Sequence, residues 1–439
     1  MKKYFLLWSR ILIVGLFISL IINLNITTAY AIDNPPELGS SGLVLMDART
    51  GQVLYGKEAD KQFYPASTTK VLTAMVVLDE VDDLSELVTV SRNCPAADGT
   101  KVGLREGDQY TVQELLTALI LFSGNDCANA LAEHVAGSIE AFAELMNKKA
   151  KSIGANNSNF KNPSGLPDPE HVTTPRDLAI IMKEAIKDPD FMNISTTRYL
   201  EFSPSVIDGH VLSVTNHNYI LLPNSKYYYE YAVTAKKGYT EAAKFTNVAV
   251  AEKDGLTLVA SFLNGENIDV VYGDVKKIFD YGFDNFKCIQ LFSQGDEIDS
   301  FTLEDGTNIP LLASSDMYYT FSNDDAENVN YKLDYNITTD YNKKSLNRGD
   351  KIVNAKVLIN GKEIGNVTLA SGISREYKSV IEKITEPEES INIIYKVLKI
   401  VLVILILIFI YLILTRKQRK FKRKHKRSIE LMKRARKNR

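Results

Sequence analysis

Cysteine is scarce in this chain of 439 residues, and histidine is nearly as rare, with three and five residues respectively. The cysteines are Cys94, Cys127 and Cys288. They allow at most one disulfide bond, so a disulfide framework does not hold the fold together. No spacing of Cys and His suggests a zinc site, and we expect neither a metal nor another cofactor. Cys127 is expected to be a small buried thiol.

The chain also lacks internal repeats, and its composition of 45% hydrophobic and 24% charged residues is ordinary for a globular protein. Its length suits two or three domains of roughly 150 residues each. The net charge of -2 hides one strongly biased segment, because residues 416–439 contain 14 Lys or Arg and a single acid, Glu430. Positive charge is therefore concentrated at the C-terminal end.

An apolar run lies near each end of the chain. At the N-terminus, basic residues precede an apolar run over residues 11–22, and the small-residue site Ala29-Tyr30-Ala31 follows it. This is the pattern of a cleaved secretory signal, so residues 1–31 are predicted to be a signal peptide. An uncleaved membrane anchor is the alternative.

The C-terminal run is unbroken over residues 400–414 and extends back to residue 391 with few polar interruptions. Roughly 20 apolar residues span a bilayer, so we predict a transmembrane helix over residues 391–415. The positive-inside rule then predicts a basic cytoplasmic tail over residues 416–439, with the rest of the chain outside the cell. A buried core helix is the alternative, but core helices are not usually followed at once by fourteen cations. Membrane lipid is the expected partner, and anionic headgroups explain the tail without nucleic acid.

Between these ends, strand patterns flank a helical middle, which predicts one α/β unit. The predicted strands are residues 42–46, 53–55, 232–235, 246–251 and 256–263, and the turns between them are at residues 49–52 and at Asp254-Gly255. The predicted helices are a buried one beginning near Ser67 and others over residues 112–122, 126–135, 139–153, 174–186 and 271–283. Thr174, Pro175 and Asp177 together resemble a capped helix start.

We place a domain boundary near residue 290. The first domain, residues 32–290, contains the motifs described below, and residues 291–386 are predicted to form a small β-rich domain. Asn360-Gly361 joins two alternating segments of this second domain and is a strong hairpin signal. It contains no group of residues that suggests chemistry, so we expect a spacer or a partner-binding module.

Three short motifs occur in a fixed order in the first domain: Ser67-Thr68-Thr69-Lys70, Ser123-Gly124-Asn125 and Lys236-Lys237-Gly238. A serine hydroxyl is a poor nucleophile until a base removes its proton, and a lysine three residues later on a helix lies on the same face. That lysine must be neutral to act as a base, which requires burial or a nearby cation. Asn125 and Lys236 are candidates for this environment.

Each motif is weak by itself, because Ser158-Asn159-Phe160-Lys161 and Lys253-Asp254-Gly255 match the same patterns by chance. The context separates the true set: a helix start, a loop between two helices, and a strand before Gly238, in that order. We therefore take the three motifs as one active site.

With their neighbours, these motifs resemble those of the D-alanyl-D-alanine carboxypeptidases, which are low-molecular-mass penicillin-binding proteins. The residues that carry the resemblance are Tyr64-Pro65-Ala66-Ser67-Thr68-Thr69-Lys70, Ser123-Gly124-Asn125-Asp126, Asn162-Pro163-Ser164-Gly165-Leu166-Pro167-Asp168 and Lys236-Lys237-Gly238-Tyr239-Thr240. The resemblance is close over residues 38–290. It implies a penicillin-binding/β-lactamase-like transpeptidase domain, an antiparallel sheet flanked by helices, in an α/β chain whose second domain is all-β. It also implies a bacterial cell membrane protein with a single span.

The resemblance implies a role for each motif residue. Ser67 would attack the carbonyl between the two terminal D-alanines of a peptidoglycan stem peptide, with Lys70 as general base. Ser123 would pass a proton to the leaving amine, and Asn125 would orient Lys70 and the substrate. β-Lactam antibiotics would acylate the same serine.

The third motif is implied to bind substrate. The backbone of Tyr239, beyond Gly238, would complete the oxyanion hole with the N–H of Ser67. Lys236 would attract the terminal carboxylate. The family has threonine or serine where this chain has Lys237, so a hydroxyl that would bind that carboxylate is missing.

Lys237 leaves two readings open: a working carboxypeptidase, or a catalytically impaired protein of the same fold with a wall-binding or regulatory role. A D,D-endopeptidase would differ only in substrate. A class A β-lactamase is excluded, because residues 126–235 contain no Glu-x-x-Leu-Asn segment. The loop over residues 162–169 is expected to be structural, and His171, His210 and His217 to be ordinary polar residues.

Overall fold

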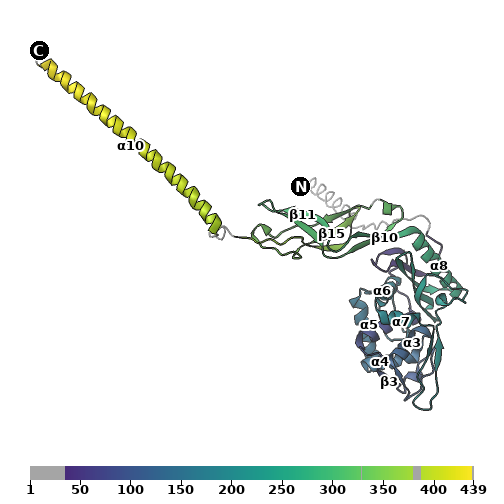
Figure 1. The fold of residues 1–439 in the computed structure, drawn as a ribbon. Coiled ribbons are helices and arrows are strands. Elements are labelled where there is room, and N and C mark those ends of the chain that lie inside the picture. The colour runs from purple at the N-terminus through teal and green to yellow at the C-terminus, as the bar shows by residue number, and fades with distance from the viewer. Residues whose placement is uncertain (1–34, 328, 379–386, 438–439) are drawn as a thin grey trace, which may run out of the picture. The chain divides into compact units, whose positions relative to one another are not determined.

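The computed structural model describes residues 35–327, 329–378 and 387–437 (Figure 1). The predicted signal peptide, residues 1–31, lies outside these ranges. The described chain forms two compact units. The first runs to Leu291 and also includes Tyr318–Asn330, and the second contains Phe292–Met317 and the chain from Tyr331 onward.

A five-stranded antiparallel sheet forms the centre of the first unit, in the order β2-β1-β9-β8-β7. Its strands are β1 (Gly42–Asp47), β2 (Val53–Lys57), β7 (Ala232–Thr240), β8 (Lys244–Lys253) and β9 (Leu256–Gly265). Asp254 and Gly255 both have positive φ, 51° and 81°, as the two-residue turn between β8 and β9 requires. The predicted strands are confirmed, and the structure extends most of them by several residues.

Helices cover both faces of this sheet (Figure 1). They are α2 (Lys70–Glu80), α3 (Val112–Leu121), α4 (Asn125–Ala136), α5 (Ile139–Ser152), α6 (Pro175–Ala185), α7 (Pro189–Thr196) and α8 (Ile268–Asn285). Alternate residues of β9 point to opposite faces: Val259 belongs to the core under α2, α3, α4 and α6, whereas Leu258 and Ala260 pack in the core with α8. Burial on both sides explains why β8 and β9 each contain consecutive apolar residues, at positions 248–251 and 258–260.

Local signals fix the ends of several helices. Thr174 accepts a hydrogen bond from the Asp177 N–H at the start of α6, as predicted. Thr111 and Glu114 form a capping box at the start of α3. In α2, all residues from Lys70 to Val77 are buried, so this helix lies at the centre of the first unit.

Three pairs of strands are separate from the central sheet. They are β3 (Leu87–Thr89) with β4 (Gln109–Thr111), β5 (Tyr199–Glu201) with β6 (Ser213–Thr215), and β10 (Phe286–Phe292) with β13 (Met317–Ser322). The second unit has its own antiparallel sheet, in the order β11-β12-β16-β15-β14. Its strands are β11 (Glu297–Thr302), β12 (Asn308–Ala313), β14 (Tyr331–Asp334), β15 (Lys351–Ile359) and β16 (Lys362–Ser371). Asn360 and Gly361, with φ of 50° and 77°, form the predicted turn between β15 and β16.

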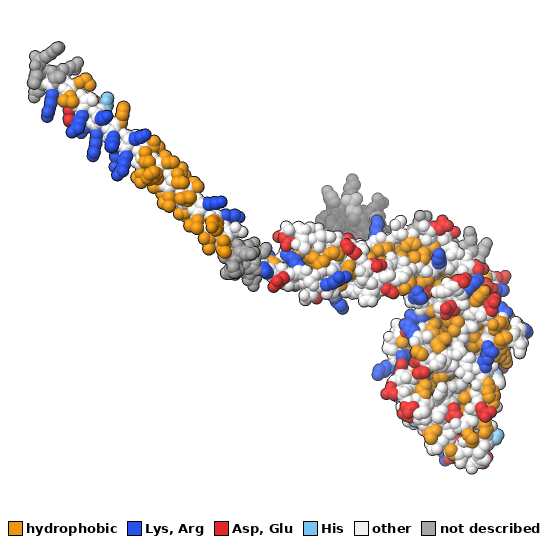
Figure 2. Space-filling view, viewed as in Figure 1, with side chains coloured by type: hydrophobic (Ala, Val, Ile, Leu, Met, Phe, Trp, Pro, Cys, Tyr) orange, Lys and Arg blue, Asp and Glu red, His pale blue; other side chains and the backbone are white. Residues whose placement is uncertain are grey.

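The chain ends in one long helix, α10 (Pro387–Lys437). The part over Ile391–Arg434 contains a window of mean hydropathy 3.3, none of which is buried against other residues. Figure 2 shows the hydrophobic stretch of this helix followed by Lys and Arg side chains. By length and composition α10 is a candidate membrane span.

Asp274 of α8 holds the segment that leads into β1, and it is 3% exposed. Its two carboxylate oxygens accept hydrogen bonds from the N–H groups of Gly39 and Ser40, at 3.0 and 2.7 Å.

We expect Asp274→Ala to lower the free energy of unfolding by about 3 kcal/mol, because two buried donors lose a charged acceptor. Urea unfolding of the full chain in detergent measures this. The control Asp269→Ala removes an exposed ion pair on the same helix and should change stability by less than about 1 kcal/mol. Equal effects of the two variants would contradict this role.

Candidate active site

Ser67 lies in a turn at the start of the central helix. The 3-10 helix η1 (Ala66–Thr69) leads directly into α2, and this brings the Lys70 side chain back onto Ser67. The Lys70 Nζ lies 3.1 Å from the Ser67 Oγ. Ser67 is half-buried, whereas Lys70 is fully buried. The Ser67 hydroxyl, which is the nucleophile candidate, therefore lies within hydrogen-bond distance of a buried amine, while Ser67 itself remains partly exposed to solvent.

The Lys70 amine has no carboxylate partner among the described residues. It donates to the Asn125 Oδ1 at 2.6 Å and to the Ser164 carbonyl oxygen at 2.7 Å. Burial lowers the pKa of Lys70 from 10.5 to about 7, and the weaker attraction of Cys127 and Asp126 opposes this shift. A substantial fraction of the amine is therefore neutral near pH 7, and a neutral amine has a lone pair that can accept the Ser67 proton.

The second motif spans the end of the loop between α3 and α4 and the first residue of α4, Asn125. Ser123 has a φ of 77°, and its buried hydroxyl has no hydrogen-bond partner among the described residues. Asn125 is held on both sides, because its N–H donates to the Thr100 carbonyl at 2.7 Å and its Nδ2 donates to the Asp98 carbonyl at 2.5 Å. These bonds point the Asn125 Oδ1 at Lys70.

Asp126, the next residue, fixes the segment that holds Asn125. Its buried carboxylate accepts hydrogen bonds from the N–H groups of Val102, Gly103 and Leu104, at 3.1, 2.8 and 3.1 Å. A carboxylate that accepts several backbone N–H groups compensates for its own burial. Asp126 therefore holds residues 102–104 beside the second motif.

The third motif lies on β7, the edge strand of the sheet. Lys236 is 1% exposed, and its amine donates to the Lys237 carbonyl at 3.1 Å. Burial, and then the nearby Lys70 and Lys237, hold the pKa of Lys236 well below its ordinary value. The electrostatic effect of Lys70 on Lys236 indicates that the first and third motifs face one region.

Gly238 allows β7 to approach the backbone of Ser67. A Cβ at this position would lie 2.6 Å from the Ser67 backbone nitrogen and 2.6 Å from the Thr246 Oγ1. Thr246, on β8, donates to the Pro65 carbonyl at 2.9 Å and so ties the sheet to the same turn. Tyr239 follows on β7; this residue is 48% exposed, and its hydroxyl donates to the Glu241 Oε1 at 3.1 Å.

The side chain of Lys237 contacts Tyr219. The Lys237 amine lies 4.1 Å from the centroid of the Tyr219 ring, and the backbone N–H of Lys237 donates to the Asn218 Oδ1 at 3.2 Å. Burial lowers the pKa of Lys237 from its ordinary value. The half-buried His217 lies next to these residues, and its ring packs 4.7 Å from that of Phe122.

The sequence did not predict two contacts of the site. The loop over residues 162–169, which is expected to be structural, supplies the Ser164 carbonyl to Lys70. His171 is not an ordinary polar residue: it is 1% exposed, and its Nδ1 accepts from the Lys161 N–H, which leaves the Nε2 proton for Thr69 Oγ1 at 2.9 Å. Burial lowers the pKa of His171 to about 4, so it stays neutral while it supports the nucleophile turn.

The run that begins at Asn162 is among the residues that carry the family resemblance, but nothing in it signalled these contacts. Gly165 has a φ of 83°, and a Cβ there would lie 1.9 Å from the Ala66 carbonyl oxygen. A residue with a side chain does not fit at this position. This loop therefore packs directly against the turn that holds Ser67.

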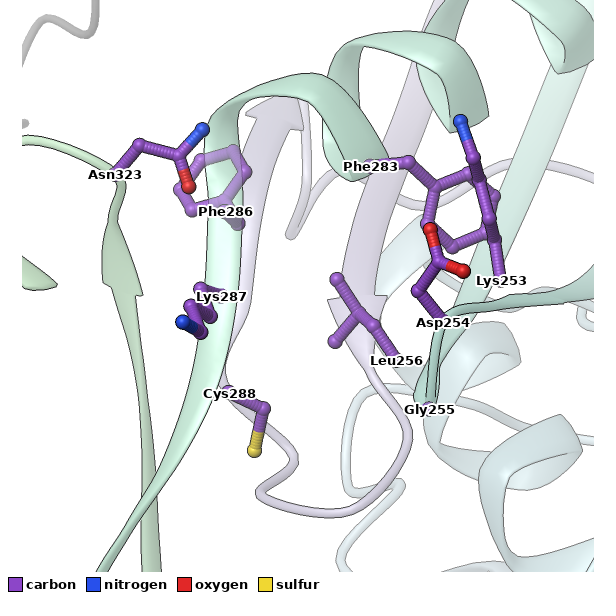
Figure 3. Close-up of a pocket in the computed structure, with 9 residues that line it drawn as sticks. All are labelled: Lys253, Asp254, Gly255, Leu256, Phe283, Phe286, Lys287, Cys288 and Asn323. Carbon is purple, nitrogen blue, oxygen red and sulfur yellow. The ribbon is translucent and has the colours of Figure 1, made fainter.

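The chance matches to the motifs have other surroundings. The Ser158 hydroxyl donates to Asp177 at 2.7 Å, and the Lys161 amine instead pairs with Glu170 at 3.3 Å. Figure 3 shows Lys253-Asp254-Gly255 at a pocket of about 300 Å³ between the turn after β8 and β10. Leu256, Phe283, Phe286, Lys287, Cys288 and Asn323 complete its lining. No residue of the three motifs at 67–70, 123–125 and 236–238 is among these lining residues.

The three cysteines are free thiols, and Cys94 and Cys127 are buried. Among the residues that the structure describes, no group of three His, Cys, Asp or Glu side chains is arranged to hold a metal ion. The assembled groups are thus a serine hydroxyl, a buried amine, an amide and a strand edge. These are the parts of a serine hydrolase with a lysine base.

The sheet, its helices and this site define the penicillin-binding class of fold. Residues 29–267 match the D-alanyl-D-alanine carboxypeptidase family, and residues 286–376 match the C-terminal domain of penicillin-binding protein 5. The first match covers more than half of the chain, so the chain belongs to the D-alanyl-D-alanine carboxypeptidase family.

Individual relatives agree with this assignment. A D-alanyl-D-alanine carboxypeptidase of Bacillus subtilis is 30% identical over 259 residues, which are 58% of this chain and 65% of the relative. One from Mycobacterium tuberculosis is 35% identical over 253 residues, 56% of this chain and 84% of the relative. The crystal structure of penicillin-binding protein 5 from Haemophilus influenzae superposes with a TM-score of 0.67 at 27% identity, and covers 78% of this chain and 98% of its own. The predicted fold class is therefore confirmed.

Gly238→Ala tests how closely β7 approaches the nucleophile. We expect acylation by a fluorescent penicillin to slow on the order of 100-fold, because the added methyl displaces the Ser67 backbone. The rate of labelling on a gel measures this. Gly273→Ala, in α8, has no atom within 4 Å of the new methyl and should label at the normal rate. Normal labelling of Gly238→Ala would show that the strand and the nucleophile are farther apart than described.

Proposed function

We propose that this protein is a serine-type D-alanyl-D-alanine carboxypeptidase, which removes the terminal D-alanine from peptidoglycan stem peptides through an acyl-enzyme on Ser67. The observation that carries the proposal is the buried Lys70 amine, 3.1 Å from the Ser67 Oγ and without a carboxylate partner among the described residues. Membership of the family supports the reaction class.

In the proposed acylation, neutral Lys70 removes the Ser67 proton while the Oγ attacks the carbonyl carbon between the two D-alanines. The C–N bond then breaks, and the leaving amine takes a proton from the Ser123 hydroxyl, which regains one from Lys70. The unpartnered Ser123 hydroxyl supports this relay. Water completes the cycle by attacking the ester, and it restores the Ser67 hydroxyl and releases the shortened peptide.

The N–H groups of Ser67 and Tyr239 are proposed to stabilise the oxyanion. The close approach at Gly238 supports this pairing. Alternation along an edge strand directs the N–H groups of Lys237 and Tyr239 to the same side, and that of Lys237 is already bonded to Asn218. One such donor contributes on the order of 3 kcal/mol to lowering the barrier. Lys236 would add positive potential near the substrate carboxylate, and Asn125 would orient the substrate amide.

A second candidate is a catalytically impaired wall-binding or regulatory protein, and the replacement of the family hydroxyl by Lys237 is the observation that favours it. The two candidates differ in turnover. An impaired protein would still be acylated by penicillin but would release no D-alanine.

The chain ends support a proposed location. A signal peptide over residues 1–31 would export the chain, and α10 would anchor it in the bacterial cell membrane. The motif-bearing unit would then lie outside the cell with its peptidoglycan substrate, and the basic tail over residues 416–439 would lie on the cytoplasmic side against anionic lipid. β-Lactams would act as acylating inhibitors. We propose no cofactor and no nucleic-acid partner.

D-Alanine release from a peptide ending in D-Ala-D-Ala tests the proposed reaction. We expect release by the full chain in detergent and none above background by Ser67→Ala, because the nucleophile is then missing. Penicillin labelling of the parent without any D-alanine release would favour the impaired protein instead.

The pH dependence tests the role of Lys70. Because its pKa is about 7 and only the neutral amine is a base, kcat/KM should rise with pH through about 7 and fall roughly tenfold for each unit below it. Lys70→Arg keeps the positive charge but cannot be deprotonated, so it should be inactive across this range. A parent profile that is flat from pH 6 to 8 would assign the base to another group.

A further inference from the structure

The loop that begins at Asn162 is shaped by this one side chain before it reaches Lys70. The Asn162 Oδ1 accepts hydrogen bonds from three backbone N–H groups, at 3.2, 2.8 and 3.1 Å, which are those of Ser164, Gly165 and Leu166. The Ser164 carbonyl oxygen then accepts from the Lys70 amine at 2.7 Å. The loop therefore forms one wall of the enclosure around this amine.

His171 joins the loop to the turn that carries the nucleophile. Its Nδ1 accepts a hydrogen bond at 3.2 Å from the backbone N–H of Lys161, the residue before Asn162. The ring proton is then on Nε2, which donates to the Thr69 Oγ1 at 2.9 Å. Thr69 directly precedes Lys70 in the chain. One imidazole ring therefore connects the start of the loop with the residue beside the amine.

The surroundings of His171 fix the position of its ring. The residue is 1% exposed, and its ring packs edge-on against Phe160, with centroids 5.5 Å apart and an interplanar angle of 89°. The Thr69 Oγ1 also lies against the loop, since a Cβ at Gly165 would be 2.9 Å from it. Loss of either hydrogen bond of the ring would leave a buried polar group unpaired, so a change at His171 is transmitted to the loop.

The ionisation of Lys70 depends on this enclosure. Burial is the largest cause of the low pKa of Lys70. Water that entered between the loop and the amine would therefore raise this pKa towards its ordinary value. The other titratable groups that interact with Lys70 or His171 are Asp126 and Cys127 on α4, Lys236 on β7, and Asp168 in the loop. His171 itself stays neutral at the pH values considered below, because burial lowers its pKa to about 4.

We propose that His171 is a positioning residue that holds the Ser164 loop against the nucleophile turn and so keeps water from the Lys70 amine. The proposal rests on the proposed function above, in which Lys70 is the base for Ser67. His171 acts through Thr69 and through the start of the loop rather than on the reacting atoms. The strength of the base is then set in part by a residue outside the three motifs.

The test is an NMR titration of the full chain in detergent, labelled with ¹³C-lysine and assigned with Lys70→Arg. His171→Phe keeps an aromatic ring but removes both hydrogen bonds, so the Lys70 midpoint should rise by about one pH unit. His171→Gln offers one acceptor oxygen and one donor nitrogen in place of the two ring nitrogens, and it should keep the midpoint of the parent. An unchanged Lys70 midpoint in His171→Phe would overturn the proposal.

Thr69→Val tests the same link without changing the histidine, and it serves if His171→Phe does not fold. It removes the acceptor for the Nε2 proton and should shift the Lys70 midpoint in the same direction. Thr117→Val is the matched control, because this threonine is also buried but donates within its own helix, to the Gln113 carbonyl at 2.7 Å. Asp274→Ala controls for loss of stability alone. An equal rise of the midpoint in either control would overturn the proposal.

Acylation of Ser67 by a fluorescent penicillin gives a second readout. At pH 6 His171→Phe should label about tenfold more slowly than the parent, because less of the Lys70 amine is neutral. The difference should shrink towards pH 9, where the amine is mostly neutral in both proteins. A loss of the same size from pH 6 to pH 9 would indicate a displaced nucleophile instead and would overturn the proposal.

Failure of the proposed function gives a different result. If the parent neither releases D-alanine nor reacts with penicillin, the NMR titration still reports on the enclosure of Lys70. A higher midpoint in His171→Phe and Thr69→Val would then support the role of His171 in a protein without peptidase activity. A parent midpoint near 10.5 would overturn the proposal whatever the peptidase assay shows, because the amine would not be shielded from water.

Discussion

The burial of the Lys70 amine is the constraint on which the rest of the site depends. Three parts of the chain enclose it: the turn that carries Ser67, the start of α4 that carries Asn125, and the loop that carries Ser164. Each supplies an oxygen, so the amine is solvated by the protein although water is excluded. The same burial that lowers its pKa also requires that all three parts remain in place. The chemistry and the packing of this unit are therefore linked through one nitrogen atom.

The sheet provides the fourth side of the site. Because β8 and β9 are covered on both faces, the edge strand β7 is held firmly, and Gly238 lets its backbone reach the nucleophile turn. Thr246 joins the two by a hydrogen bond to Pro65. A rigid edge beside a rigid helix start is the preorganisation that an oxyanion site needs. Lys237 lies on this edge, where one residue can change recognition without disturbing the core.

Much of this could be predicted from the sequence, where local signals were strong. Asp254-Gly255 and Asn360-Gly361 predicted turns because few other pairs adopt positive φ at both positions. Thr174 predicted the start of α6 by its capping pattern. The three-residue strands β3 to β6 and the short helix α7 were not predicted, because elements of this length show little periodicity.

Contacts between distant segments could not be predicted in the same way. Ser164 acts through a backbone carbonyl, which carries no signature of its own, and His171 is buried only because its loop folds against η1. The course of Lys237 depends on Tyr219, eighteen residues earlier, and on the fold that places that ring. The sequence therefore predicted that Lys70, Asn125 and Gly238 share one site with Ser67, and the structure adds what surrounds them.

The most direct test of this account is an NMR titration of the lysine side chains in protein labelled with ¹³C-lysine, with Lys70→Arg to assign the signal that disappears. The account predicts that the Lys70 signal titrates near pH 7. A midpoint near the ordinary value of 10.5 would show that the amine is a cation at neutral pH, and would contradict its proposed role as the base for Ser67.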